Sequence, residues 1–379
     1  MWSPGHAAPD ANPPPYAVAP GLFDQAKPDL GLAPAAGACT FTIFRPDDDT
    51  DKFSNGVVLV RFKGRFHAQW QSSARDEDAP DTWVACSSSA DGEKWTRPYA
   101  LSPAGGGTAM HSSGGWWTDG ITLVAYVNVW PDGFGPGKGG HAEYRLSTDG
   151  ETWSEPQRIM GRDGQPLEGI IEQDPHAYGG RLFTAFHVPP GLTAKPYYTD
   201  DPLGRSGWTA GEMASLPREK STSRELEPSL FQRGPELVMV FRDQSSSYRQ
   251  LAAVSRNRGV TWTTPVLTDM PDARAKQSAG NLPDGTAFLV NAPHAGRERL
   301  PLAVTLARGG RHFDRSFRLR GHDDLPPLRY EGRYKRPGYH YPKSIVADGF
   351  LFVGYATNKE DVQLTRIPLS SFQAETSPR

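Results

Sequence analysis

Several residues with reactive or charged side chains lie near the ends of predicted short strands. Glu227 comes before one apolar segment and Arg242 ends it, 15 residues later. Tyr341 precedes the last apolar segment, and Asp76 lies in an acidic loop. A carboxyl group can transfer protons, a phenol can attack an electrophile, and a guanidinium can bind an anion in a bidentate manner. A structural interpretation also exists for each, such as an ion pair between Arg242 and Asp243 or Glu227.

The histidines are dispersed along the chain and show no spacing that is typical of metal ligands. Five of them lie in five separate segments: His67, His111, His176, His187 and His340. We therefore predict no metal site.

Composition excludes several broad classes of protein. The 379 residues include 41 Lys and Arg against 43 Asp and Glu, so the net charge of −2 gives no reason to expect nucleic acid or an anionic membrane as a partner. No apolar run is long enough to span a bilayer, and we expect no membrane insertion. Two cysteines are too few for a disulfide framework.

The pattern of apolar residues favours an all-β protein. The chain contains 40 Gly and 35 Pro, and its apolar segments are short and rich in β-branched and aromatic residues. Examples are residues 56–62, 121–129, 181–187, 236–241 and 350–355. Residues 1–37 are rich in Pro and Ala without any periodicity, and we interpret them as an N-terminal arm that precedes a folded domain at 38–379.

An internal repeat predicts the architecture of that domain. Three segments share a Ser, an Asp-Gly or Asn-x-Gly turn and a Trp, at residues 89–95, 147–153 and 255–262. Weaker copies begin at 199 and 307, so the starts are 52–58 residues apart, near the period of a four-stranded propeller blade. We predict a six-bladed β-propeller of antiparallel blades, with seven blades as the alternative, closed by pairing of the first strand after the arm with the last strands.

The repeats resemble the Asp-boxes of sialidase-like β-propellers, in which they form outer turns without a catalytic role. Sialidases bind a sugar carboxylate with arginines, attack with a tyrosine that a glutamate assists, and use an aspartate as acid and base. The resemblance implies Tyr341 as nucleophile, Glu227 as its partner and Arg242 as a carboxylate ligand. It also implies Asp76 as the acid/base, with Asp78 as the next choice.

Two further features of the sequence bear on this resemblance. Residues 291–302 resemble the family segment that carries another arginine, which implies Arg299 as a second carboxylate ligand. The family's first arginine is missing, because residues 53–58 read FSNGVV, and Arg45 is a substitute at a poorly matching offset. The substrate class is therefore kept broad and includes sialic, ulosonic and uronic acids.

Other polar residues are candidate substrate contacts because a propeller brings the inner strands of its blades to one axis. We name His176, His187 and Lys276, which lie in polar segments around single strands. Loop or interblade contacts are the alternative for each.

Three functions remain open at this point. The first is a retaining glycoside hydrolase that releases a terminal anionic sugar from an acidic glycan without a cofactor, in a secreted or periplasmic location. The second is a polysaccharide lyase that cleaves a uronate-containing glycan by β-elimination, with His67, His111, His187 or Tyr341 as base. The third is a non-catalytic propeller that stacks sugars on aromatic residues such as Trp70, Trp116 and Trp117.

Overall fold

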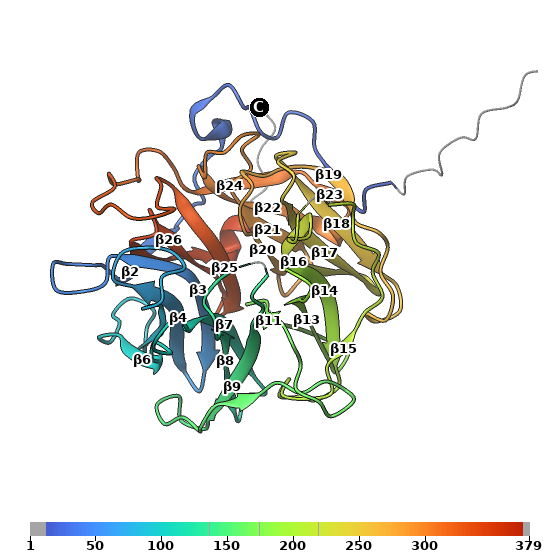
Figure 1. Ribbon diagram of the computed structural model, residues 1–379. Helices are drawn as coiled ribbons and strands as arrows, with labels where there is room; N and C mark the ends of the chain where they lie inside the picture. The colour runs from blue at the N-terminus through green and yellow to red at the C-terminus, as the bar shows by residue number, and fades with distance from the viewer. Residues whose placement is uncertain (1–12, 136, 174, 219, 374–379) are drawn as a thin grey trace, which may run out of the picture.

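The structure is a β-propeller with six blades around a central axis (Figure 1). The computed structural model describes residues 13–135, 137–173, 175–218 and 220–373. The prediction of an all-β propeller is confirmed, and the number of blades is six. In the described part of the chain, no helix is long and apolar enough to cross a membrane.

The first three blades follow one another along the chain, each running from an inner to an outer strand. The first blade contains β3 (Phe53–Phe62), β4 (Arg65–Ser73), β5 (Trp83–Ser89) and β6 (Tyr99–Ser102). The second contains β7 (Met110–Thr118), β8 (Leu123–Trp130), β9 (His141–Ser147) and β10 (Gln157–Arg158). The third contains β11 (Ile170–Ile171), β12 (His176–Tyr178), β13 (Arg181–Val188), β14 (Thr193–Thr199) and β15 (Thr209–Ala210).

The last three blades include the one that closes the ring. The fourth contains β16 (Glu225–Arg233), β17 (Glu236–Asp243), β18 (Arg249–Ser255) and β19 (Val266–Pro271). The fifth contains β20 (Ser278–Asn281), β21 (Ala287–Asn291), β22 (Leu302–Ala307) and β24 (Arg315–Arg320). The sixth contains β25 (Tyr339–Ala347), β26 (Phe350–Thr357), β27 (Asp361–Pro368) and β2 (Cys39–Phe44).

The ring closes by the predicted pairing of distant segments. β2 is antiparallel to β27, with Cys39 opposite Arg366 and Thr42 opposite Gln363. β2 directly precedes β3 of the first blade and pairs with β27 of the sixth. The hydrogen bonds between β2 and β27 therefore join the start of the domain to its end and close the ring.

The hydrophobic core lies between the blades. All eight residues of β8 are buried, because both faces of this strand pack against neighbouring blades. Ala125 and Val127 face the first blade, and Val124 and Tyr126 face the third. Side chains of a strand alternate between its two faces, so a continuous apolar run is what a strand between two blades requires.

The Asp-boxes form tight outer turns that are held by side chains. In the first box, Ser89 Oγ accepts a hydrogen bond from the Gly92 N–H at 2.8 Å, and Asp91 Oδ1 accepts one from the Glu93 N–H at 2.8 Å. Gly92 has a φ of 75°, which glycine adopts at no steric cost, and the Trp95 indole N–H donates to its carbonyl at 3.1 Å. Corresponding contacts to the Ser and to the Asp or Asn form in the boxes at 147–153 and 255–262.

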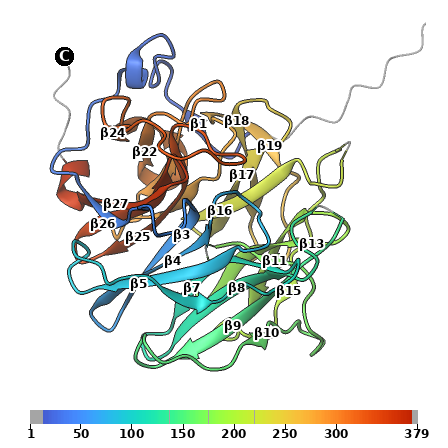
Figure 2. The ribbon, with the colours of Figure 1, turned by 60° about the vertical axis from the view of Figure 1, so that its left-hand side comes forward.

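Residues 13–37 lie over the edge of the propeller (Figures 1 and 2, blue). β1 (Ala17–Val18) runs parallel to β23 (His312–Phe313), and the Tyr16 ring packs against Phe231 and Phe313. Residues 1–12 of the proposed arm lie outside the described residues.

Candidate active site

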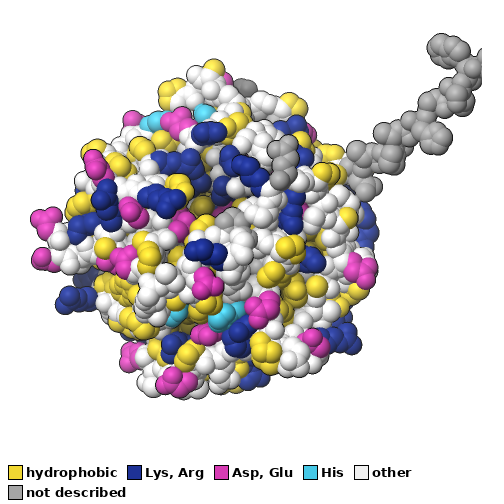
Figure 3. Space-filling model, viewed as in Figure 1, with side chains coloured by type: hydrophobic (Ala, Val, Ile, Leu, Met, Phe, Trp, Pro, Cys, Tyr) yellow, Lys and Arg dark blue, Asp and Glu magenta, His cyan; other side chains and the backbone are white. Residues whose placement is uncertain are grey.

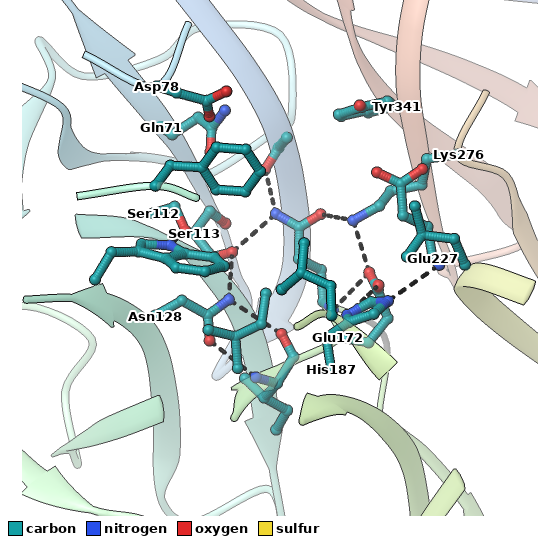
Figure 4. A pocket seen from close by; sticks show the side chains of 18 of the residues that line it. Gln71, Asp78, Ser112, Ser113, Asn128, Glu172, His187, Glu227, Lys276 and Tyr341 are labelled. Atoms are coloured by element: carbon teal, nitrogen blue, oxygen red, sulfur yellow. Dashed lines mark hydrogen bonds and ion pairs between the residues drawn. The ribbon is translucent and has the colours of Figure 1, made fainter. Parts of the chain in front are cut away.

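A cavity of about 270 Å³ lies where the inner strands converge. Residues from all six blades contribute to its wall (Figure 4). Its polar lining includes Gln71, Glu77, Asp78, Ser112, Asn128, Glu172, His187, Glu227, Arg242, Lys276 and Tyr341. Its apolar lining includes Met110, Trp130, Phe134, Ile170, Leu192 and Leu226. The combination of an apolar wall and a few convergent polar groups is typical of a ligand site.

Glu227 is held in an unusual backbone conformation at a bulge in β16. Its φ is 50°, and the register with β17 shifts between Leu226 and Ser229. The Glu227 N–H donates to His187 Nε2 at 3.2 Å, and its carbonyl accepts from Gln277 Nε2 at 3.0 Å. Non-glycine residues in the left-handed region cost free energy and gather at functional sites, and these two hydrogen bonds hold the strained backbone that carries the Glu227 side chain.

The Glu227 carboxylate is paired with Arg242, which was the structural alternative considered from the sequence. Arg242 Nη1 lies 2.8 Å from Glu227 Oε2. Burial alone would raise the pKa of Glu227, but the charges of Arg242 and Lys276 dominate and lower it to about 2. Glu227 is therefore ionised at any physiological pH and can accept a proton or a hydrogen bond.

Tyr341 occupies a second bulge, on β25, and faces several cations. Its φ is 52°, and the register with β26 shifts between His340 and Lys343. Lys276 Nζ lies 5.4 Å from the centre of the phenol ring, and the Arg299 guanidinium lies 5.3 Å from it. Burial raises the pKa of Tyr341, and the nearby Glu227 charge adds to this, so the phenol is neutral.

Asp78, and not Asp76, lines the cavity. Asp76 is 40% exposed, pairs with Arg75 at 3.6 Å and accepts a hydrogen bond from the Arg333 N–H at 2.8 Å. Asp78 lies across the cavity from Glu227 and Tyr341 (Figure 4), with a φ of 61°. Burial and the neighbouring Glu77 raise the pKa of Asp78 to about 7. Asp78, the second choice from the sequence, thus lies in the cavity where Asp76 was expected, because the loop directs its side chain inward.

Arg299 is almost fully buried and is oriented by a histidine. Its side chain donates to His340 Nδ1 at 2.8 Å, and His340 Nε2 donates to the Arg336 carbonyl at 3.0 Å. Burial and the charge of Arg299 lower the pKa of His340 well below its usual value, which keeps the ring neutral. The Nε atoms of Arg242 and Arg299 are buried and have no hydrogen-bond partner among the described residues. Two buried guanidinium donors are therefore available for an anion.

Beneath the cavity lies a buried ionic cluster that sequence reasoning identified only in part. Lys276 Nζ lies 2.7 Å from Glu172 Oε1 and 2.8 Å from Gln173 Oε1. His187 Nδ1 lies 4.0 Å from Glu172 Oε2. Lys276 and His187 thus line the cavity, but their hydrogen bonds are made to the protein. Glu172 was not proposed as a site residue from the sequence. The available signal was its position beside Gln173, directly after the inner strand β11.

At the position where the resemblance implies a first arginine, on β3, this chain has smaller polar residues. Ser54 and Asn55 occupy β3, and the Asn55 amide donates to Glu77 Oε1 at 3.1 Å. The Glu77 carboxylate also pairs with Lys359, whose Nζ lies 5.8 Å from the centre of the Tyr341 ring. Arg45 is exposed and pairs with Asp361 at 3.1 Å, outside the cavity lining. Lys359 therefore supplies a cation near the position that the sequence left without one.

Several other candidates lie outside the cavity. His176 is on β12, with its ring centre 6.3 Å from that of Tyr178. His67 lies under Gly150 of the second Asp-box, and His111 contacts Ser102 at 2.8 Å. Trp70 and Trp116 are buried in the blades, and the Trp117 indole N–H donates to the Pro202 carbonyl.

In the described part of the chain, no three His, Cys, Asp or Glu side chains are arranged so that they could hold a metal ion. The polar groups of the cavity are instead arranged in cation–carboxylate pairs, such as Arg242 with Glu227.

Fold and site together define a propeller with a cavity of paired cations and carboxylates where its inner strands converge, and comparison with known proteins gives the family. Residues 64–353 match the family described as "BNR repeat-like domain". The chain belongs to this family of sialidase-like Asp-box β-propellers. No curated protein matches the sequence.

Solved structures of sialidases share the fold at low sequence identity. A sialidase superposes with a TM-score of 0.60 and 18% identity over 93% of this chain and 35% of that one, so this chain spans about a third of that protein's length. The Hadza microbial sialidase Hz136 gives a TM-score of 0.68 and 15% identity over 88% and 69%. The intramolecular trans-sialidase from Ruminococcus gnavus, in complex with oseltamivir carboxylate, gives 0.67 and 13% over 88% and 98%.

Proposed function

We propose that this protein is a retaining glycoside hydrolase that releases a terminal anionic sugar, of the sialic, ulosonic or uronic acid class, from an acidic glycan. The main support for the proposal is that one cavity contains two carboxyl groups whose pKa values are shifted in opposite directions. Glu227 has a pKa of about 2 and Asp78 a pKa of about 7. Groups whose environments separate their pKa values in this way are suited to act as base and acid.

In the first proposed step, the Tyr341 oxygen bonds to the anomeric carbon while the bond to the leaving oxygen breaks. As this bond forms, the phenol oxygen becomes strongly acidic, so its proton goes to Glu227 although that carboxylate is a weak base. The Asp78 proton goes to the leaving oxygen. A neutral phenol suits a sugar that carries a carboxylate at or near the anomeric carbon, because a carboxylate nucleophile would be repelled.

In the second step, water attacks the anomeric carbon and the bond to Tyr341 breaks. Asp78 accepts the proton of the water, and Glu227 returns its proton to the phenol. Two displacements give net retention at the anomeric carbon. The sugar carboxylate binds the buried donors of Arg242 and Arg299, and no cofactor takes part. We expect the protein to be secreted or periplasmic, because a glycan of this kind is its proposed substrate.

The test is incubation of the protein with sialylated, ulosonic-acid-capped and uronate-containing glycans, with detection of free sugar and of absorbance from unsaturated uronate. We expect a saturated acidic monosaccharide without a rise in absorbance. Tyr341→Phe and Asp78→Asn should each lower kcat at least 100-fold. Asp76→Asn is the matched control, because this exposed carboxyl lies two residues from Asp78 and outside the cavity, and it should keep full activity.

Three results would contradict the proposal. Rising absorbance would identify a lyase, with His187 or Tyr341 as the base available in the cavity. Binding of every glycan without turnover would identify a carbohydrate-binding propeller. Loss of activity in Asp76→Asn but not in Asp78→Asn would return the acid/base role to Asp76.

A further inference from the structure

A second group of cations lies beside the cavity, on loops of the fourth and fifth blades. Arg274 lies between β19 and β20, and Arg297 and Arg299 lie between β21 and β22. The Arg299 side chain donates to the Arg274 carbonyl at 3.4 Å, which ties the first of these loops to the second. Figure 3 shows many Lys and Arg side chains on the upper half of this face of the molecule.

The loop between β17 and β18 positions two of these arginines. Arg274 Nη1 donates to the Ser246 hydroxyl at 2.8 Å, and Arg297 Nε donates to the Tyr248 hydroxyl at 3.2 Å. The same loop contributes Gln244 to the wall of the cavity. A single short loop therefore connects the cavity to both guanidinium groups.

Three residues of these loops have a strained backbone conformation that hydrogen bonds and packing must stabilise. Ser246, Tyr248 and Arg274 have φ values of 67°, 56° and 54°, in the region that favours glycine. Such strain persists only where the surrounding structure determines it, and it gathers at ligand sites. Asp243 supplies that support, because its carboxylate forms a bidentate pair with Arg224 at 2.9 Å and accepts from the Ser245 N–H at 2.9 Å.

Among the described residues, Arg274 and Arg297 form no ion pair with a carboxylate, and Asp243 acts on Arg274 only from a longer distance. The contacts of Arg274 and Arg297 described above are made to neutral hydroxyls, and Arg274 Nε is buried without a hydrogen-bond partner in the described part of the chain. Burial and repulsion from Arg242 and Arg297 lower the pKa of Arg274. Gathering cations without counter-charges is unfavourable in the free protein and becomes favourable when an anion binds.

One sugar carboxylate does not account for all of these cations. Arg242 lines the cavity, and Arg299 lies beside the Tyr341 ring without lining the cavity. Their buried Nε donors suffice to bind one carboxylate. Arg274 and Arg297 remain, and Arg297 is exposed at the rim. We infer that Arg274 and Arg297, positioned by Ser246 and Tyr248, form an accessory subsite for a second anionic group of the bound glycan. The inference rests on the proposed function only in that both anionic groups belong to one glycan.

The test compares ligands that differ by one anionic group. Binding of monosialyllactose, disialyllactose and a sulfated sialyllactose is measured by calorimetry on the Tyr341→Phe variant, which should not turn them over. We expect the doubly charged glycans to bind at least tenfold more tightly at low salt. Arg274→Gln and Arg297→Gln should reduce this preference to less than threefold, while Kd for monosialyllactose changes less than twofold. Comparison of the two doubly charged glycans shows whether a carboxylate or a sulfate is preferred.

Two control variants separate the effect of positioning Arg297 from the effect of removing a positive charge. Tyr248→Phe removes one oxygen and leaves every charge in place, and it should reduce the preference about threefold through Arg297. Arg97→Gln removes an exposed arginine of the first blade and should have no effect. Melting temperatures establish that each variant is folded.

Inorganic sulfate gives a readout that does not depend on the sugar. Sulfate should raise the melting temperature of the protein, and less so for Arg274→Gln and Arg297→Gln. If no sialyl glycan binds but this difference persists, the proposed substrate is wrong and the anion subsite stands. An unchanged glycan preference together with unchanged sulfate stabilisation in both variants would overturn the inference.

Discussion

The His187 side chain accepts a hydrogen bond from the Glu227 backbone N–H, at 3.2 Å from Nε2. The contact joins the third blade to the fourth, 40 residues apart in sequence. Because Nε2 is the acceptor, the ring is neutral with its proton on Nδ1, on the side of Glu172. Burial lowers the pKa of His187 and favours this neutral form.

We predict that His187 positions Glu227 for catalysis. His187→Leu removes the acceptor and should lower kcat 10–100-fold with little change in KM, because small displacements of a reacting group are costly. His187→Gln keeps an acceptor at a similar distance and should retain activity within about fivefold. Steady-state kinetics on the released sugar provides the measurement, and equal losses in both variants would argue against positioning.

The pH dependence of activity should follow Asp78. Because the pKa of Asp78 is about 7, its proton is lost above neutral pH, and kcat/KM should fall about tenfold per pH unit there. Glu227, with a pKa of about 2, stays ionised and gives no acid limb above pH 3. A pH profile measured from 4 to 9 tests this, and activity that rises with pH above 7 would exclude Asp78 as the acid.

Because its pKa is raised, Asp78 should lower the free energy of unfolding at alkaline pH. The pKa of Asp78 in the folded state lies above its value of 3.8 in the unfolded chain, so folding binds a proton between pH 4 and 7. Stability from this group therefore falls as pH rises through that window. We expect Asp78→Asn to be more stable than the unmodified protein at pH 8, by roughly 1–3 kcal/mol, and equally stable near pH 4. Urea unfolding at the two pH values would show whether this holds.

The buried pair of Lys276 and Glu172 should matter strongly for stability. Lys276→Met leaves the Glu172 charge deprived of its nearest partner, at a cost of about 3 kcal/mol. The double variant with Glu172→Gln removes both charges and should recover a large part of this loss. Denaturant unfolding measures both, and additive losses in the double variant would mean that the two charges are not coupled.

The Asp-boxes should contribute to stability without affecting the reaction. Ser147 Oγ accepts from the Gly150 N–H at 2.7 Å and donates to Asp149 at 2.9 Å. Ser147→Ala should lower the free energy of unfolding by about 1–2 kcal/mol and leave kcat/KM unchanged. A large loss of kcat/KM in a folded variant would show that this turn influences the cavity.

The sequence by itself determined the architecture of this protein. The Asp-box period and the short apolar strands predicted a propeller of six blades, with seven as the alternative, and its closure, because turn chemistry and strand alternation are local properties. The pairing of Glu227 with Arg242 was also accessible, since the two residues lie on adjacent strands of one blade.

Only the tertiary structure decided which side chains meet on the axis. Asp76 and Asp78 are both acidic residues in one loop, and only the fold shows that Asp78 faces the cavity. Lys359 and Glu77 are 282 residues apart, and Arg299 reaches His340 across 41 residues. Contacts of this kind depend on how blades converge, because inner strands that are distant in sequence end side by side. The accessory arginines likewise gain a shared role only from the loop that brings their guanidinium groups together.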